Sequence, residues 1–128
     1  MFSALGRVVV LVDDQERALA FYRDVLGFAT LHDERAGDLR YLHVGLGGPH
    51  GAGLWLMAPM SADERALVGR QAGAQPLLVL YTDDLEHVRE RLAAHGVDVW
   101  AEREDADSRS LHFRDVVGNV IVAAQLLA

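Results

Sequence analysis

The chain contains neither cysteine nor lysine. Its 128 residues carry 19 acidic side chains against 12 basic ones, all of them arginine, for a formal net charge of -7. Without cysteine there is no thiolate nucleophile, no cysteine-ligated zinc site and no iron–sulfur cluster. The missing disulfides also favour a reducing compartment, so we expect a cytoplasmic protein.

The sequence also lacks the features of a nucleic-acid or membrane protein. Binding a phosphate backbone needs clustered Lys or Arg, whereas these arginines are scattered, mostly among acidic neighbours. The early apolar run from Val8 to Val12 is followed at once by Asp13 and Asp14, which neither a signal peptide nor a membrane span would tolerate. We therefore expect no nucleic-acid partner and no membrane insertion.

Apolar runs of strand length alternate with helical patterns in the first half of the chain. The β-branched run at 8–12 is typical of a strand that is covered on both faces. Asp13 or Asp14 then caps a helix that we expect to reach about Leu26, before Gly27. Three weaker strand signals follow. They predict strands at 29–33, 39–45 and 53–57, which gives the order βαβββ.

The same pattern starts again at Pro76. The two halves match at an offset of 70, which places Val9 to Asp14 over Val79 to Asp84 and indicates an internal duplication. In the second half we expect a strand at 77–81, a helix ending at Gly96, and strands at 97–102, 110–114 and 119–126.

A short helix is predicted between the two halves. Ser61 and Glu64 have the spacing of a capping box, in which each side chain binds a free backbone N–H of the first turn. We expect a single domain over residues 1–128, with module one at about 1–59, a linker helix at about 60–74 and module two at about 75–128.

Three features together resemble the vicinal oxygen chelate superfamily: the two βαβββ units, the segment FYRDVLGF at 21–28, and the closing turn DVVGN at 115–119. This superfamily includes glyoxalase I, extradiol dioxygenases, fosfomycin-resistance enzymes and bleomycin-resistance proteins. The resemblance covers nearly the whole chain. It implies an α+β fold whose modules form a curved mixed sheet, or cup, with helices on the convex face. Val116 stands where the family usually has proline, so we expect a less rigid turn there.

The resemblance also identifies the positions at which enzymes of the superfamily hold a divalent cation. These positions are occupied here by Arg7, Trp55, Leu77 and Val122. Leucine, valine and tryptophan supply no metal donor, and arginine is permanently protonated. We therefore expect neither a bound metal nor another cofactor.

Counting by twos from these positions gives a largely apolar lining of the cup. Trp55 offers a stacking face, Met57 an adaptable surface and Arg7 a fixed cation, a mixture that suits a planar or aromatic organic ligand. The alternative is that the side chains pack against one another as core. The predicted ligand-binding residues are Arg7, Val9, Leu11, Tyr41, His43, Trp55, Met57, Leu77, Tyr81, His112 and Val122.

The function we expect is metal-independent binding of a small molecule, as in the bleomycin-resistance branch, which sequesters an antibiotic or natural product without changing it. The alternative is a divergent lyase, isomerase or dioxygenase-like enzyme that uses His43, His112 or Tyr81 as acid–base groups. Each histidine could instead be satisfied by backbone or water. A filled cup would leave a structural or regulatory interaction module. The resemblance further implies a homodimer, because members of the superfamily commonly pair.

Overall fold

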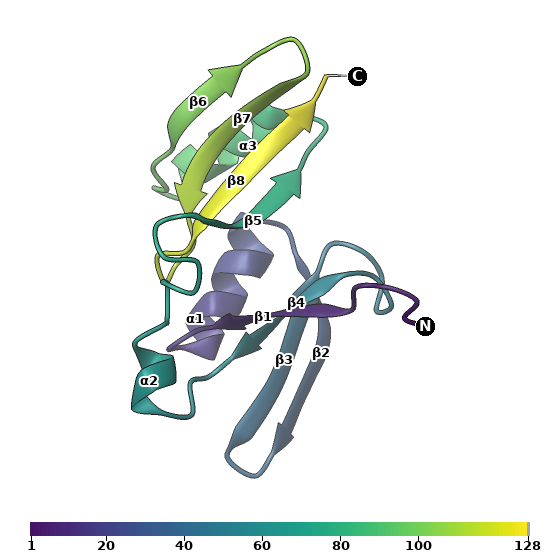
Figure 1. Ribbon diagram of the computed structural model, residues 1–128, viewed down its shortest axis with the longest axis vertical. Helices are drawn as coiled ribbons and strands as arrows, with labels where there is room; N and C mark the ends of the chain where they lie inside the picture. The colour runs from purple at the N-terminus through teal and green to yellow at the C-terminus, as the bar shows by residue number, and fades with distance from the viewer. Residues whose placement is uncertain (128) are drawn as a thin grey trace. The chain divides into compact units, whose positions relative to one another are not determined.

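The computed structural model describes residues 1–127, and these form two four-stranded mixed sheets in two compact units. Unit 1 is Met1–Gly69, and unit 2 begins at Arg70. Each unit has a βαβββ order, which confirms the predicted α+β class and the two tandem modules (Figure 1). Both sheets are open, each with two edge strands, so closure into a curved cup stays a prediction.

In unit 1 the strand order is β1-β4-β3-β2, with β1 and β4 parallel and the other pairs antiparallel. Helix α1 contacts β4 and covers one face of the sheet. The elements of unit 1 are β1 (Arg7–Leu11), α1 (Gln15–Ala20), the π-helix η1 (Phe21–Val25), β2 (Ala29–Ala36), β3 (Leu39–Gly45), β4 (Gly53–Met57) and α2 (Ala62–Arg65).

The first helix begins as predicted but changes type before its end. The side chain of Asp14 accepts a hydrogen bond from the backbone N–H of Arg17, the N-cap interaction expected of this residue type. The α-helix ends at Ala20, and the π-helix η1 continues to Val25 where a regular helix to Leu26 was predicted. The wider turn accompanies the complete burial of Tyr22, whose ring packs edge to face against Phe28 at 5.3 Å between centroids.

The predicted linker helix is much shorter than expected. Ser61 Oγ accepts a hydrogen bond from the N–H of Glu64, but α2 ends at Arg65. Gly69 and Gly73 adopt positive φ angles of 74° and 65°, a left-handed conformation that does not continue an α-helix. Turns therefore carry the chain from α2 to unit 2.

Unit 2 repeats this topology, with the order β5-β8-β7-β6, and α3 contacts β8. Figure 1 shows α3 behind β7 and β8. The elements are β5 (Pro76–Tyr81), α3 (Leu85–Ala94), β6 (Trp100–Glu104), β7 (Ser108–Arg114) and β8 (Val120–Leu126).

Strand β6 starts three residues later than the predicted 97–102. The N–H of Val97 donates to Leu92 O and that of Gly96 to Ala93 O, the two hydrogen bonds of a Schellman motif. Val97 therefore completes the end of α3 and is not available to a strand.

The closing turn is held by side chains and does not need the proline of the family pattern. Asp115 Oδ1 accepts hydrogen bonds from the N–H groups of Val117 and Asn119, and Asn119 Nδ2 donates to Asp115 Oδ2. Both Asp115 and Asn119 are buried. Where the sequence predicted a less rigid turn at Val116, the structure thus supplies an alternative restraint. No helix among the described residues is long and apolar enough to span a membrane.

Candidate functional site

The site predicted in the first module lies on the face of the unit 1 sheet opposite α1, which we call the open face. Strand pairing places Val9 beside Trp55 and Trp55 beside His43, and directly paired residues point to the same face. The alternate residues, such as Leu42 and Leu56, are fully buried. The predicted ligand-binding residues on the open face are Arg7, Val9, Leu11, Tyr41, His43, Trp55 and Met57.

Aromatic rings form a row across the strands of this face. His32 on β2, His43 on β3 and Trp55 on β4 are consecutive pairing partners, with ring centroids 5.1 Å and 5.2 Å apart. Tyr41 lies diagonally from Trp55 at 5.9 Å. The rings are tilted by 41° to 50° to one another, so they pack together without stacking in parallel.

Arg7 holds His43 in place and fastens the loop before β4. Its Nε donates to His43 Nδ1 at 3.1 Å, its Nη1 to Gly51 O at 2.8 Å and its Nη2 to Pro49 O at 2.9 Å. The side chain passes close to Gly53, where an added methyl group would lie 3.4 Å from Arg7 Cδ. The direct contact of Arg7 with a ligand stays a prediction, and its observed role is to position His43.

This contact sets the tautomer of the neutral His43 ring. Arginine only donates, so Nδ1 must be the accepting nitrogen and the neutral ring carries its proton on Nε2. Burial lowers the pKa of His43, and the nearby charges of Arg7 and His32 lower it further. His43 is thus a hydrogen-bond donor through Nε2, with no nitrogen lone pair left for a general base.

Two buried donors on the open face have no acceptor within the part of the chain that the structure describes. They are His43 Nε2 and Trp55 Nε1, which belong to paired residues on adjacent strands. Buried N–H groups are nearly always hydrogen-bonded, because a buried donor that has lost water and gained no partner is costly. Within residues 1–127, these two neighbouring side chains therefore each have a buried N–H group without a hydrogen-bond partner.

A cavity of about 320 Å³ opens beside Trp55. Sequence reasoning found three of its residues, Tyr41, Trp55 and Met57, and missed the others. Leu39 could have been found by continuing the alternation of β3 back from Tyr41, whereas no pattern marks the remainder. The other lining residues are Gln15, Asp38, Leu39, Arg40, Ala58 and Met60.

Two of the lining residues, Gln15 and Arg40, are held by polar contacts. Gln15 Nε2 donates to the backbone oxygens of Arg40 and Leu56, at 2.9 Å and 3.0 Å, and so attaches the start of α1 to β3 and β4. Arg40 forms ion pairs with Asp33, at 2.8 Å, and with Glu16. These carboxylates raise the pKa of Arg40 and balance its charge.

Unit 2 presents a corresponding row with different side chains. Its consecutive pairing partners are Val79, Val122, His112 and Trp100. His112 therefore occupies the same position in its module as His43 does in the first, whereas Val122 takes the place of Trp55. The rings of Trp100 and His112 pack together with their centroids 5.7 Å apart. Arg114 Cζ lies over the Trp100 ring, 4.5 Å from the centroid of that ring. The His112 Nδ1 atom is buried without a partner among the described residues.

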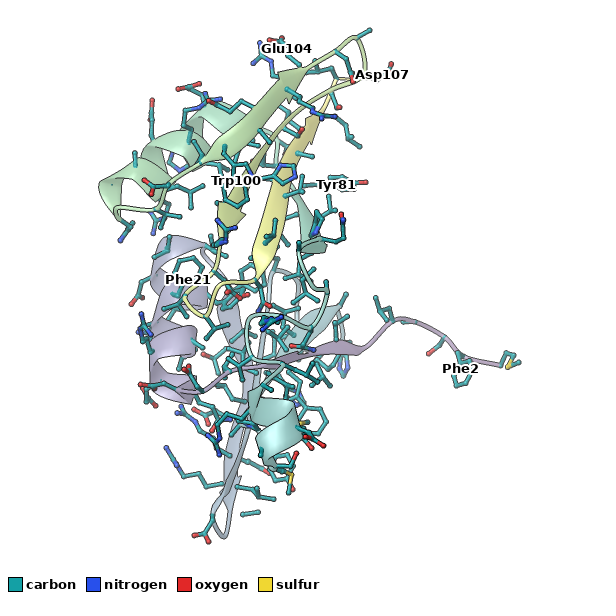
Figure 2. The ribbon with its side chains drawn as sticks, turned by 60° about the vertical axis from the view of Figure 1, so that its left-hand side comes forward. Phe2, Phe21, Tyr81, Trp100, Glu104 and Asp107 are labelled. Atoms are coloured by element: carbon teal, nitrogen blue, oxygen red, sulfur yellow. The ribbon has the colours of Figure 1, made fainter. Side chains whose placement is uncertain are left out.

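The other predicted residues of unit 2 lie on its edge strand β5. Tyr81 is 69% exposed and points away from α3 (Figure 2). Leu77 lies at a bulge between Pro76 and Leu78, where the register shifts and simple alternation is interrupted. A groove of about 430 Å³ in this unit is lined by none of the predicted site residues.

The continuous apolar run of β1 does not have the two covered faces that the sequence predicted. Val9 is 37% exposed, and its counterpart Val79 on β5 is 57% exposed. Both strands lie at a sheet edge, and the helix of each unit covers only one face. Apolar side chains consequently remain accessible on both units.

The residues at the family's metal positions do not fit a divalent ion. Arg7 is a cation whose N–H groups are directed to carbonyl oxygens and His43, and Trp55 offers only an N–H donor. Leu77 and Val122 have no donor atom. Within residues 1–127, no three His, Asp or Glu side chains converge as a metal site would require.

The sequence profile of the Glyoxalase/Bleomycin resistance protein/Dioxygenase superfamily matches residues 4–123. Among solved structures, TnmS3, an antibiotic-binding protein from Streptomyces sp. CB03234, is 30% identical over 98% of this chain and 97% of its own, with a TM-score of 0.81. UcmS2 is 28% identical over the full length of both chains, also with a TM-score of 0.81.

A glyoxalase/bleomycin resistance protein from Streptomyces sp. CB03234 is 30% identical over 94% of this chain and 98% of its own, with a TM-score of 0.69. No curated protein sequence matches the chain. The matched profile spans both modules, with the FYRDVLGF segment and the closing turn at 115–119 inside it. The chain therefore belongs to the Glyoxalase/Bleomycin resistance protein/Dioxygenase superfamily.

Proposed function

We propose that the protein binds a small planar organic molecule, an antibiotic or an aromatic metabolite, and sequesters it in the cytoplasm without changing it and without a metal ion. The observation that carries this proposal is the position of Trp55, whose ring borders a cavity of about 320 Å³ together with Tyr41 and Met57. This volume lies at the lower end of the range of small-molecule sites, which are typically lined by apolar and aromatic side chains.

The similarity to an antibiotic-binding protein supports the same function. TnmS3 covers almost the whole chain at 30% identity. Fold alone does not assign a function within a superfamily, whereas the side chains of the open face do bear on it. There the positions that hold the metal in related enzymes carry Arg7 and Trp55, and Trp55 belongs to the aromatic row.

Binding fits the chemistry of His43 better than acid–base catalysis does. A general base needs a free nitrogen lone pair, whereas Nδ1 of His43 is occupied by Arg7 and Nε2 carries the proton. The other proposed acid–base groups, His112 and Tyr81, belong to unit 2. A sequestering protein needs no proton transfer and uses the same face only for contact.

We also propose that the protein acts as a homodimer. The accessible apolar side chains Val9, Val79 and Tyr81 lie on the edge strands β1 and β5, and exposed strand edges are usually covered in native proteins. Light scattering at micromolar concentration should give twice the mass of the chain. A monomeric mass would contradict this part of the proposal.

The binding proposal is tested by calorimetric titration of the purified protein with a panel of aromatic and glycopeptide antibiotics. We expect at least one ligand to bind at micromolar concentration, with affinity unchanged by EDTA. Trp55→Ala should abolish binding, whereas Trp100→Ala in unit 2 serves as the matched control and should not. Loss of binding in EDTA with recovery on adding a divalent metal would contradict metal independence. Failure of every ligand to bind would contradict the function itself.

A further inference from the structure

The two unpartnered donors of the open face define the chemical class of the ligand more closely. We infer that Trp55 Nε1–H and His43 Nε2–H donate hydrogen bonds to an oxygen acceptor, a carbonyl or a carboxylate, carried by a flat aromatic ligand. This inference rests on the proposed function, because it describes the same face.

The two donor groups lie close together on the open face. His43 and Trp55 are directly paired between β3 and β4, with ring centroids 5.2 Å apart, so their N–H groups belong to one small area of the sheet. Both N–H groups are buried, and neither has an acceptor among the described residues. One oxygen has two lone pairs and can accept from two donors, as can two oxygens of one carboxylate.

The chemistry of His43 and its neighbour Arg7 limits which ligand groups can bind beside Trp55. His43 cannot accept a proton or a hydrogen bond at Nε2 while Arg7 occupies Nδ1. The guanidinium of Arg7 lies next to His43, with Nε 3.1 Å from Nδ1, so a cationic group placed against His43 would be repelled. The two unpartnered N–H groups, at His43 Nε2 and Trp55 Nε1, are therefore both donors, and they favour a ligand group that accepts over a cationic group that only donates.

A ligand must also be able to reach the two buried N–H groups. The donor atoms are buried in this structure, so a neighbouring side chain must move when a ligand enters. Met57 and Met60 line the cavity next to Trp55, and Met60 is exposed. Methionine side chains are unbranched and adapt readily to a new neighbour. Movement of these two side chains would open the cavity to a flat ring.

The inference is tested with four probes of one ring size: 1,4-naphthoquinone, 2-naphthoate, naphthalene and 1-naphthylmethylammonium. The first two carry acceptor oxygens, the third has none, and the fourth is a cation. The chain has no cysteine or lysine that a quinone could alkylate. Binding is followed by NMR of the ¹⁵N-labelled protein, in which the indole N–H of Trp100 in unit 2 is an internal control for that of Trp55.

We expect the quinone and the naphthoate to bind about tenfold or more tightly than naphthalene, since each net 1.4 kcal/mol is a factor of ten. Both should shift the Trp55 indole proton downfield and leave that of Trp100 unchanged. The ammonium probe should bind more weakly than naphthalene. In Trp55→Phe, which keeps an aromatic face but loses the N–H, the quinone should lose part of this advantage, because His43 Nε2–H remains, while naphthalene binding is retained. Trp100→Phe should behave as the wild type.

The outcomes separate this inference from the proposed function. Equal affinity for quinone and naphthalene, with no shift of the Trp55 indole proton, would overturn the donor assignment and leave aromatic binding intact. Preference for the ammonium probe would also overturn it. Failure of all four probes to bind at millimolar concentration would overturn both proposals together.

Discussion

Arg7 donates a hydrogen bond from Nε to Nδ1 of His43, 3.1 Å away, and passes close to Gly53 on the way. The contact joins the edge strand β1 to β3, which is not its direct neighbour in the sheet. It sets the tautomer of His43 and the polarity of the open face.

The pKa of His43 should lie below the usual value for histidine, about 6.5. Burial is the largest cause, followed by the charges of Arg7 on β1 and His32 on β2. NMR titration of the His43 ring protons measures this directly. In Arg7→Leu the pKa should rise only partway towards 6.5, because burial remains. A wild-type pKa at or above 6.5 would contradict the assignment.

The same shift predicts how stability depends on pH. Because the folded-state pKa of His43 is lowered, the unfolded chain binds a proton at higher pH than the folded chain does. The contribution of His43 is therefore present above about pH 6.5 and is lost as the pH falls towards the folded-state pKa. Urea unfolding at pH 7.5 and pH 5 should show a smaller loss in His43→Gln than in the wild type. An identical loss in both proteins would rule out this contribution.

Gly53 should not tolerate a side chain. A methyl group there would lie 2.7 Å from Val44 O and 2.9 Å from Leu31 Cδ1, distances at which the backbone or the neighbour must move. Gly53→Ala should lower the free energy of unfolding by about 2 kcal/mol, a typical cost of overpacking, as measured by urea denaturation. Gly6→Ala is the matched control, since nothing lies within 4 Å of its added methyl group. Its change should stay within about 0.5 kcal/mol.

Asp115 should be essential for the closing turn of unit 2. Asp115→Ala leaves the buried N–H of Asn119 without its acceptor, which should cost about 2 kcal/mol of unfolding free energy. Asp98→Ala, at an exposed position of the same unit, should change stability by less than about 0.5 kcal/mol. Thermal denaturation of the two variants provides the comparison. Equal melting temperatures would show that the turn does not depend on this carboxylate.

The protein should be more stable with glycine at position 101 than with alanine or a larger residue. The φ angle of Ala101, 54°, is left-handed, which costs a residue with a side chain about 1–2 kcal/mol and glycine little. Ala101→Gly should raise stability by about 0.5 kcal/mol, because the flexibility of glycine in the unfolded chain offsets part of the gain. Ala101→Val should lower it by about 1 kcal/mol or more, because β-branched residues are rarely left-handed. Denaturant midpoints of the three proteins measure the order.

Periodicity and capping residues were sufficient to predict the modules, because these signals depend on residues close in sequence. Strands β3 and β4 begin and end where the sequence predicted them, and Asp14 and Asp84 cap the helices. The errors occur where local rules compete. The π-turn at 21–25 and the Schellman motif at Val97 depend on how a helix end fits its surroundings, which periodicity does not describe.

For the site, strand alternation correctly placed Tyr41 and His43 on the same face as Trp55. Strand alternation could not show that Arg7 donates hydrogen bonds to Gly51, Pro49 and His43, because these contacts join distant parts of the chain. Gln15 and Met60 were missed for the same reason. The ligand-binding role of the predicted residues remains a prediction.

His43 and His112 hold the same position in the two modules, beside Trp55 in one and Val122 in the other. In an oligomer of identical single-module chains, any substitution would be present in every module. In a tandem chain the two equivalent positions are separate residues, so a substitution of Trp55 leaves Val122 unchanged. The two modules can therefore differ at equivalent positions of one fold, with an aromatic side chain on one sheet and an aliphatic side chain at the same place on the other.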